Sequence, residues 1–212
     1  MSSAAEKEAV RGILAGFGPS PVIVELGAHV GEEAEWIMPL CNHPQYVMVE
    51  PDAENINKIL RKQLPGLWTV LPWAIGSYNR VEVIFFSSEN HTSNNRASGS
   101  VRRPTGHLKH FPEVTFSETH VPLWTLDAVF LESNIDHIDL LWCDIQGAER
   151  DMIEGGRATL AKTRYMMIEA EPEIELYEGQ ALKPELIAML PDWVVLQDFG
   201  YNLLMWNSKY AQ

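Results

Sequence analysis

Cysteine is scarce in this sequence, which has only Cys41 and Cys143 among its 212 residues. The two cysteines lie far apart and share no spacing that is typical of a metal site. A disulfide framework needs more cysteines than this and an oxidising compartment. The sequence therefore favours a reducing environment, and we expect a cytoplasmic location.

Positive charge is also limited. The chain has 16 lysines and arginines against 29 aspartates and glutamates, and its net charge is -13. A protein that binds duplex nucleic acid or an anionic membrane surface needs clustered cations. The basic cluster Arg102-Arg103 is too short to supply them, so we expect neither nucleic acid nor membrane as a partner.

Long hydrophobic runs are missing as well. No apolar stretch approaches the roughly 20 residues that a membrane helix needs. The start, MSSAAEKEAVRGIL, lacks the basic residues and apolar run of a signal peptide. Hydrophobic residues still make up 46% of the chain and charged residues 21%, which is a globular composition. We expect one domain over 1–212, since this length can bury one good core.

Strand-like and helix-like segments alternate along the chain. This pattern predicts an α/β fold in which a mostly parallel, doubly wound sheet has helices on both faces. Short apolar, β-branched runs predict strands at 21–25, 46–50, 67–71, 81–86, 138–143 and 165–170. Helices are expected at 3–16, after Gly31 with Trp36, Ile37 and Leu40 buried, from Asp52 to about 63, from about 148, and at 182–190. Segments 193–197 and 203–206 predict an antiparallel terminal hairpin at one edge of the sheet.

The pattern breaks between Ser87 and His120, where Ser, Asn, Thr, Gly, Arg, Pro and His are frequent. A long irregular segment inside a domain is usually a functional loop or lid, or is disordered. We interpret 87–120 as an irregular insertion on the substrate side. Its histidines, of which His91 and His110 are our candidates, could act as a base near neutral pH. Solvated loop histidines are the simpler interpretation.

A turn with two glycines follows the first predicted strand. In open α/β sheets, ligands bind beyond the carboxyl ends of the strands. Gly27 would let the backbone turn sharply near a ligand, Gly31 would let the next helix pack closely, and free N–H groups at the helix start attract a carboxylate. Glu25 favours an ammonium group over a pyrophosphate, so a zwitterionic amino-acid tail fits this turn. The predicted contacts are Glu25, Gly27, Ala28, His29 and Gly31.

The same two glycines are also compatible with an ordinary tight turn. The dinucleotide pattern G-x-G-x-x-G is not met, because Ala28 and His29 lie between the glycines, and this disfavours an NAD-dependent enzyme. Glu50 ends the second strand, where an acid binds ribose hydroxyls in nucleoside-binding folds, although it could be a solvated strand end. Pro51, Trp73 and Ala74 follow the neighbouring strands, and Trp73 could form a flat wall for adenine or belong to the core.

Two further segments resemble the signature of FkbM-type methyltransferases. Thr125-Leu126-Asp127 matches a T-L-D stretch, and Asp144-Ile145-Gln146-Gly147-Ala148-Glu149 follows a strand as the family's D-x-E-G-A-E does. The resemblance spans roughly 22–171. It implies a class I, Rossmann-like methyltransferase fold, S-adenosylmethionine as the methyl donor with S-adenosylhomocysteine as product, and methylation of a hydroxyl oxygen. The implied cofactor positions are Glu25, Gly27, Gly31 and Glu50, with Asp144 beside the reacting centre.

Gln146 departs from the family pattern, which usually has Glu there, and any role that needs a second carboxylate is in doubt. Asp144 is our first candidate for a carboxylate beside the cofactor or acceptor, and a cap on the following helix is the alternative. Glu169 and Glu171 could join Asp144 in an oxygen-rich Mg²⁺ or Ca²⁺ site. A charged strand end in solvent explains them as well, so a divalent metal is possible but not favoured and none is assigned.

The acceptor is not fixed by the sequence. A sugar hydroxyl, a small metabolite and a modified peptide all fit, and we favour a hydroxyl oxygen of a small molecule or sugar. A non-catalytic nucleoside-binding module with the same fold, or less favourably an NAD-dependent enzyme, is the alternative. The oligomeric state stays open.

Overall fold

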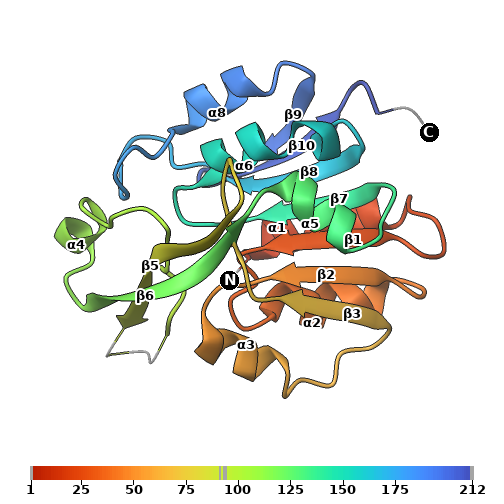
Figure 1. Ribbon diagram of the computed structural model, residues 1–212. Coiled ribbons are helices and arrows are strands. Elements are labelled where there is room, and N and C mark those ends of the chain that lie inside the picture. Colours follow the sequence, from red (N-terminus) through yellow and green to blue (C-terminus); the bar gives the residue numbers. More distant parts are fainter. Residues whose placement is uncertain (1, 91, 93–94, 211–212) are drawn as a thin grey trace.

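A seven-stranded sheet forms the centre of the structure, a computed structural model that describes residues 2–90, 92 and 95–210 (Figure 1). Its strand order is β3-β2-β1-β7-β8-β10-β9, and β10 runs antiparallel to both of its neighbours while the other pairs are parallel. The strands are β1 Val22–Leu26, β2 Gln45–Val49, β3 Leu67–Leu71, β7 Ile138–Cys143, β8 Thr163–Glu169, β9 Trp193–Asp198 and β10 Asn202–Asn207. The predicted doubly wound, mostly parallel sheet with an antiparallel terminal hairpin is confirmed.

Helices cover both faces of this sheet, because successive strand residues point to opposite sides. On β1, Val22, Val24 and Leu26 belong to a core with residues of α5, α6, α7 and α8, whereas Ile23 packs on the other face with α1, α2 and α3. The helices are α1 Ala4–Leu14, α2 Glu32–Ile37, α3 Ala53–Ile59, α5 Leu126–Glu132, α6 Glu149–Gly155, α7 Arg157–Leu160 and α8 Lys183–Met189.

A second sheet extends from one end of the central sheet, on the left in Figure 1. It has the order β4-β6-β5 and is built from β4 Ala74–Ile75, β5 Arg80–Asn90 and β6 Val114–Trp124, with the short helix α4 His107–His110 between β5 and β6. The expectation that 87–120 is irregular is therefore wrong at both ends. Ser87 and Ser88 pair with Ser117 and Phe116. Polar residues can occupy these strands because the ladder satisfies the backbone and much of β6 faces solvent.

Two helix predictions also differ from the structure. Leu40 was expected to be buried, but it lies in the 3-10 turn η1 Met38–Leu40 and is 48% exposed, while Met38 takes the buried position. Pro39 stops α2 at Ile37, because proline cannot continue a regular helix. Asp52 does cap α3, accepting hydrogen bonds from the following backbone N–H groups, but this helix ends at Ile59 rather than near 63.

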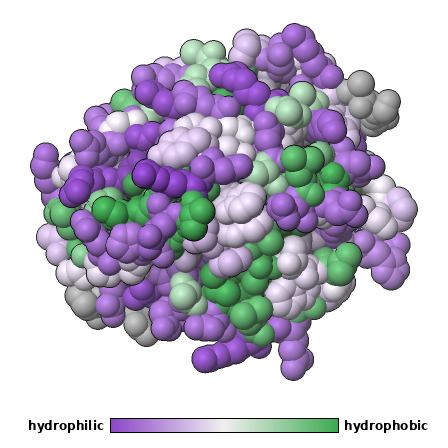
Figure 2. All heavy atoms as spheres, in the orientation of Figure 1, coloured by the Kyte–Doolittle hydropathy of each residue, from purple (hydrophilic) through white to green (hydrophobic). Residues whose placement is uncertain are grey.

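One face of the molecule is mainly hydrophilic. Figure 2 shows polar side chains over most of one face, with hydrophobic side chains gathered in smaller groups between them. Across the described residues, none of the helices has the length and apolar character to span a bilayer.

Candidate functional site

A cleft opens where β1, β2 and β7 end side by side. Because these neighbours are parallel, their carboxyl ends share one edge of the sheet, where α/β proteins bind ligands. The cleft has a volume of about 510 Å³, including space open to solvent. Most of the residues predicted to bind a cofactor line it, namely Gly27, His29, Glu50, Pro51, Trp73, Ala74 and Asp144.

A smaller hollow of about 440 Å³ adjoins this cleft and shares Gly27, His29, Ala97 and Asp144 with it. Its remaining lining is strongly acidic and includes two further predicted residues, Glu25 and Ala28, together with Glu32, Glu33 and Trp142. Gly31 lines neither space. It has a φ of 74°, and a side chain added there would meet Ile59 at 3.4 Å, so this glycine serves the packing of α3.

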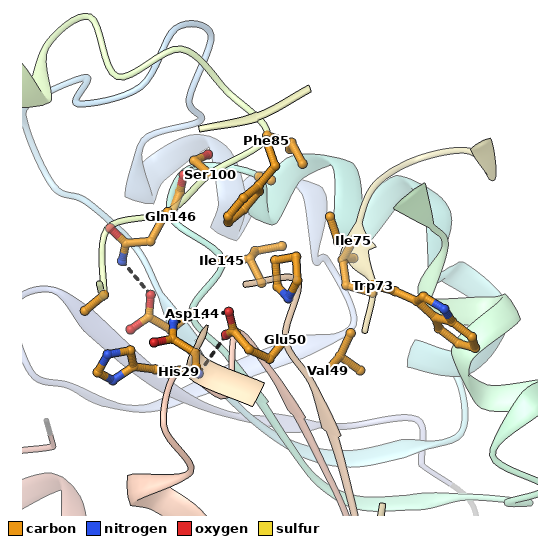
Figure 3. A pocket seen from close by; sticks show the side chains of 18 of the residues that line it. His29, Val49, Glu50, Trp73, Ile75, Phe85, Ser100, Asp144, Ile145 and Gln146 are labelled. Atoms are coloured by element: carbon orange, nitrogen blue, oxygen red, sulfur yellow. Dashed lines mark hydrogen bonds between the residues drawn. The ribbon is translucent and has the colours of Figure 1, made fainter. Parts of the chain in front are cut away.

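Glu50 is buried and points into the cleft (Figure 3). Its Oε2 accepts a hydrogen bond from the His29 N–H at 2.8 Å, and its Oε1 accepts from the Asp52 N–H at 2.9 Å and from Asn55 Nδ2 at 3.4 Å. Burial raises the pKa of Glu50 to about 8, although these hydrogen bonds oppose the shift. A carboxylate has roughly four acceptor positions, so one remains for a ligand hydroxyl.

The backbone of the glycine turn is less available to a ligand than the sequence suggested. The N–H groups of Gly27 and Ala28 both donate to the Val49 carbonyl, at 2.9 and 3.1 Å, and the His29 N–H donates to Glu50. The Gly31 N–H donates to the Ala28 carbonyl at 2.7 Å. These four N–H groups are therefore engaged within the protein.

Glu25 lies on the acidic side of the turn. It is buried, and its Oε2 accepts a hydrogen bond from the Tyr46 hydroxyl at 2.9 Å. Burial and the nearby Glu33 raise the pKa of Glu25 well above its usual range. A cationic group in the adjoining hollow would offset the cost of ionising this carboxyl, as an ammonium group does.

The turn after β7 is stabilised by hydrogen bonds from its own backbone to the Glu149 side chain. Glu149 is buried, and its Oε1 accepts hydrogen bonds from the N–H groups of Ile145 at 3.2 Å and Gly147 at 3.3 Å. Gln146 and Gly147 both have left-handed backbone, with φ values of 53° and 91°. Helix α6 begins without a side-chain cap, so Asp144 is not the helix cap that we weighed as an alternative. The turn instead leaves the Asp144 side chain on the cleft.

A single amide joins two carboxyl groups beside this turn. Gln146 Nε2 donates to Asp144 Oδ1 at 2.6 Å and to Glu169 Oε2 at 3.0 Å, and the Tyr177 hydroxyl donates to Gln146 Oε1 at 2.7 Å. Burial, with Asp144 and Glu149 nearby, raises the pKa of Glu169. Gln146 thus supplies two donors where a glutamate would add a third negative charge.

The Gln146 amide also lies where the sequence left open a Mg²⁺ or Ca²⁺ site with Asp144 and Glu169. Its nitrogen lies between the two carboxyl groups that a bridging cation would need. Within the part of the chain that the structure describes, no set of three or more His, Cys, Asp or Glu side chains is arranged to hold a metal ion.

The apolar wall of the cleft differs from the predicted one. Trp73 contributes to the lining, but its indole stacks on Trp124, with ring centroids 4.5 Å apart, and points away from the cavity (Figure 3). The ring of Phe85 points into the cavity instead, next to Ile145. Val49 and Ile75 complete this wall. Phe85 lies on β5, and nothing in the sequence pattern links that strand to the cleft.

The candidate catalytic histidine His110 lies outside the cleft. His110 is exposed at the end of α4 and lines a different cavity from Asp144. His91 falls outside the described residues. Asp144 is therefore the one candidate among the three that the structure places in the cleft.

The T-L-D stretch has a structural explanation. The Thr125 hydroxyl caps α5 by accepting from the Ala128 N–H. Asp127 Oδ1 accepts from both the N–H and the hydroxyl of Thr159, at 2.8 and 2.7 Å, and so joins α5 to α7. This part of the motif therefore serves the packing of α5 against α7, and none of its three residues lines the cleft.

Comparison with known proteins is consistent with this geometry. The family described as the methyltransferase FkbM domain matches residues 25–203. The curated 2-O-methyltransferase NoeI of Sinorhizobium fredii is 32% identical over 199 residues, which covers 90% of this chain and 81% of that protein.

Solved structures share the fold. The magnesium protoporphyrin IX methyltransferase ChlM from Synechocystis PCC 6803, determined with bound S-adenosylmethionine, aligns with a TM-score of 0.52 and 8% identity over 95% of this chain and 76% of its own. A putative rRNA-methylase from Clostridium thermocellum aligns with a TM-score of 0.51 and 7% identity over 97% of this chain and 94% of its own. At such low identity the likeness concerns the fold alone, and it confirms the predicted class I, Rossmann-like architecture.

Proposed function

The chain belongs to the FkbM methyltransferase domain family, and on this premise we propose that it transfers the methyl group of S-adenosylmethionine to a hydroxyl oxygen of a sugar or another small molecule. The observation that carries the proposal is the buried Glu50 carboxyl, which points into the cleft formed by the ends of β1, β2 and β7. The likeness to a 2-O-methyltransferase supports the choice of oxygen as the acceptor atom.

The residues of the cleft fit the chemistry of the donor. Glu50 has an acceptor position left for a ribose hydroxyl, and the apolar wall of Val49, Ile75, Phe85 and Ile145 suits an adenine ring. The acidic hollow with Glu25 suits the ammonium end of the amino-acid tail. When bound, the donor supplies an electrophilic methyl group on a cationic sulfur.

The protein's own contribution is mainly positioning. Methyl transfer requires the acceptor oxygen to lie in line behind the methyl group, and holding two reactants in that geometry supplies much of the rate. Asp144 is placed for this task, because it lines both the cleft and the acidic hollow and is fixed by Gln146. A carboxylate here also offsets the positive charge of the donor.

Titration calorimetry tests the proposal. We expect S-adenosylhomocysteine to bind and NAD not to bind, and we expect S-adenosylhomocysteine to form from S-adenosylmethionine when small hydroxylated acceptors such as methyl glycosides are added. Tight binding of NAD without binding of S-adenosylhomocysteine would overturn the proposal. Binding without turnover on any acceptor would favour the non-catalytic module.

The affinity for S-adenosylhomocysteine should depend on pH through Glu50. With a pKa of about 8, this carboxyl carries a proton at neutral pH, and the ionised form is the better acceptor for a ribose hydroxyl. Affinity is therefore expected to rise with pH, by at most about tenfold per unit between pH 6 and 8, and to level off above that. Calorimetry at pH 7 in buffers of different ionisation enthalpy should detect the released proton.

The Glu50→Ala variant is the control for this pH dependence. It is needed because other carboxyl groups with a raised pKa, such as Glu25, also lie near the cleft. A profile that keeps its slope in Glu50→Ala would assign the proton to another group.

Arg96 fixes the segment that covers the cleft. Its guanidinium contacts Asp52 Oδ2 at 2.9 Å and Ser87 Oγ at 2.6 Å, and its carbonyl accepts from Asn55 Nδ2 at 3.3 Å. Ala97, Gly99 and Ser100, just beyond it, line the cleft. We expect Arg96→Ala to weaken binding of S-adenosylhomocysteine by about three- to tenfold, because the segment must then be ordered on binding.

Calorimetry measures this effect, and Arg150→Ala is the matched control. Arg150 also forms an ion pair, with Glu185 at 3.1 Å, but it is on the surface and lines none of the spaces described above. Equal affinities for the two variants would show that the Arg96 contacts do not hold the segment for the ligand.

A further inference from the structure

A second cavity meets the donor cleft at Gln146. Its volume is about 910 Å³, including space open to solvent, and Gln146 is the residue that lines both spaces. Its walls come from α4, the end of β5, the start of β6 and the chain after β8. Its lining includes His107, Phe111, Gln146, Glu169, Glu171 and Tyr201.

The two carboxyl groups bridged by Gln146 belong to different spaces. Asp144 lines the donor cleft and Glu169 lines the second cavity, and each accepts a hydrogen bond from the same amide nitrogen, at 2.6 and 3.0 Å. The amide is itself held, because its Oε1 accepts from the Tyr177 hydroxyl at 2.7 Å. Glu169 is thus the carboxyl of the second cavity that lies next to the donor side.

The lining of the second cavity selects the kind of ligand. Among the described residues that line it there is no lysine or arginine, but there are three glutamates, of which Glu171 and Glu113 lie beyond Glu169. Large apolar side chains at its walls are unusually exposed, with Tyr201 at 60% and Phe111 at 42%. Carboxylates accept hydrogen bonds from hydroxyl groups, and apolar rings cover the C–H faces of a small ring. An anionic ligand would be repelled.

His107 is buried in the wall of the second cavity. It is only 4% exposed, and its Nδ1 has no hydrogen-bond partner within the described chain. This nitrogen is itself closed off from solvent, so it does not present a contact to a ligand in the cavity. The cavity therefore provides acceptors and an apolar surface.

We infer that the second cavity binds the methyl acceptor, an uncharged ring with several hydroxyl groups, and that Glu169 is the catalytic base that takes the proton of the attacking hydroxyl. The inference rests on the proposed function, and it adds the acceptor site, the charge of the acceptor and the identity of the base. Glu169 replaces His91 and His110 in the role that we gave to them from the sequence.

The step balances as follows. As the bond between the acceptor oxygen and the methyl carbon forms, the bond between that carbon and sulfur breaks, and its electron pair stays on sulfur. The hydroxyl proton passes to a carboxylate oxygen of Glu169 and leaves to solvent through the open side of the cavity. The products are a methyl ether and neutral S-adenosylhomocysteine. A general base contributes about 10² to 10⁴ to such a rate.

Gln146 is a positioning residue in this scheme. Its amide orients the Glu169 carboxyl and keeps it beside Asp144 without adding negative charge. The raised pKa of Glu169 makes this carboxyl a stronger base than an exposed glutamate.

The first test measures binding apart from turnover. Saturation-transfer NMR with S-adenosylhomocysteine present should detect methyl glycosides of neutral hexoses and give no signal for the matching hexuronic acids. Tyr201→Ala and Phe111→Ala should weaken glycoside binding by about tenfold and leave the affinity for S-adenosylhomocysteine unchanged. Absence of glycoside binding, or equal binding of the uronic acids, would overturn the inference about the acceptor.

The second test concerns the base. Glu169→Gln should bind S-adenosylhomocysteine and the glycoside as the wild type does, yet lower kcat by about a hundredfold, whereas Glu169→Asp should restore part of the loss. In the wild type kcat should rise with pH until Glu169 ionises, and Glu169→Gln should lose this limb. Glu154→Gln, an exposed residue of α6 outside both spaces, is the control.

The two proposals fail in different ways. If the wild type does not bind S-adenosylhomocysteine, the proposed function fails. If it binds S-adenosylhomocysteine and methylates a glycoside, but Glu169→Gln retains kcat and the same pH profile, then Glu169 is not the base.

Discussion

Glu50→Ala is expected to weaken binding of S-adenosylhomocysteine by about ten- to a hundredfold, which corresponds to one charge-assisted hydrogen bond of about 1.5–3 kcal/mol. A carboxylate with both oxygens free could accept one such bond from each ribose hydroxyl. The structure leaves one acceptor position, because the N–H groups of His29 and Asp52 and the amide of Asn55 already occupy three. Calorimetry at pH 9, above the Glu50 pKa of about 8, measures the loss with the wild-type carboxyl ionised.

Glu54→Ala is the matched control for this loss. Glu54 lies in the first turn of α3 and carries the same charge, but it is exposed and does not line the cleft. We expect its affinity to equal that of the wild type. Unchanged affinity in a folded Glu50→Ala variant would remove Glu50 from the binding site, and circular dichroism checks that the variant folds.

Asn55 determines whether a second ribose bond can form. Its Nδ2 lies 3.4 Å from Glu50 Oε1 and 3.3 Å from the Arg96 carbonyl, so it is a long contact shared between two acceptors. If a ligand hydroxyl displaces this contact, the effect of Glu50→Ala should approach the upper end of the range. If the contact persists, the effect should lie near the lower end.

The central sheet was predictable because its signals are local. Each core strand is a short β-branched or apolar run, and the parallel order follows from the alternation with helices. Once the strands are assigned, Glu25, Glu50 and Asp144 lie at the ends of three strands, and a parallel sheet brings these ends to one edge. The cleft follows from this topology and needs no knowledge of side-chain packing.

The walls of the site depend on distant contacts, which local patterns do not encode. The Trp73 ring turns away from the cleft because it stacks on Trp124, which belongs to another strand of the chain. Tyr177 reaches Gln146 from 31 residues away, and its hydroxyl also lies 3.0 Å from the Ser98 carbonyl. No spacing in the sequence indicates these pairs, so Phe85, Tyr177 and the bridging role of Gln146 appear only in the folded chain.

The second sheet was predicted only in part, for a different reason. A strand was expected at 81–86, but neither its extension to Asn90 nor β6 was expected. The missed part of β5 carries polar residues such as Ser87 and Ser88, which loops also contain. Their backbone groups form hydrogen bonds with β6, a strand that lies far away in the sequence. Composition therefore suggested a loop, while cross-strand pairing produces a strand.

Gly27→Ala is expected to destabilise the protein by at least about 3 kcal/mol and to lower the midpoint of thermal unfolding by about 10 °C. A Cβ at this position would lie 1.8 Å from the Asp144 carbonyl oxygen and 2.9 Å from its carbonyl carbon. Neither atom belongs to a flexible side chain, so the ends of β1 and β7 would have to separate. The φ of +79° adds the cost of left-handed backbone for a residue with a side chain.

Two other glycines supply graded controls for this variant. Gly31→Ala shares the left-handed φ, at +74°, but its nearest neighbour is the flexible Ile59 Cγ1 at 3.4 Å and its other neighbours are side-chain atoms at 3.7 Å, so it should cost about 1–2 kcal/mol. Gly12→Ala lies inside α1 with no atom within 4 Å, and it should stabilise the protein by about 0.5–1 kcal/mol because alanine favours a helix. Urea unfolding measures all three.

Comparing the stability losses of these variants distinguishes two causes, namely steric crowding against the backbone of Asp144 and the left-handed conformation that glycine adopts. If conformation alone matters, Gly27→Ala and Gly31→Ala should lose the same stability. If crowding against Asp144 dominates, Gly27→Ala should lose far more, and the surviving folded fraction should bind S-adenosylhomocysteine weakly, because Asp144 lines both donor spaces. A stable Gly27→Ala variant with full affinity would contradict the close approach of β1 and β7 on which the donor site depends.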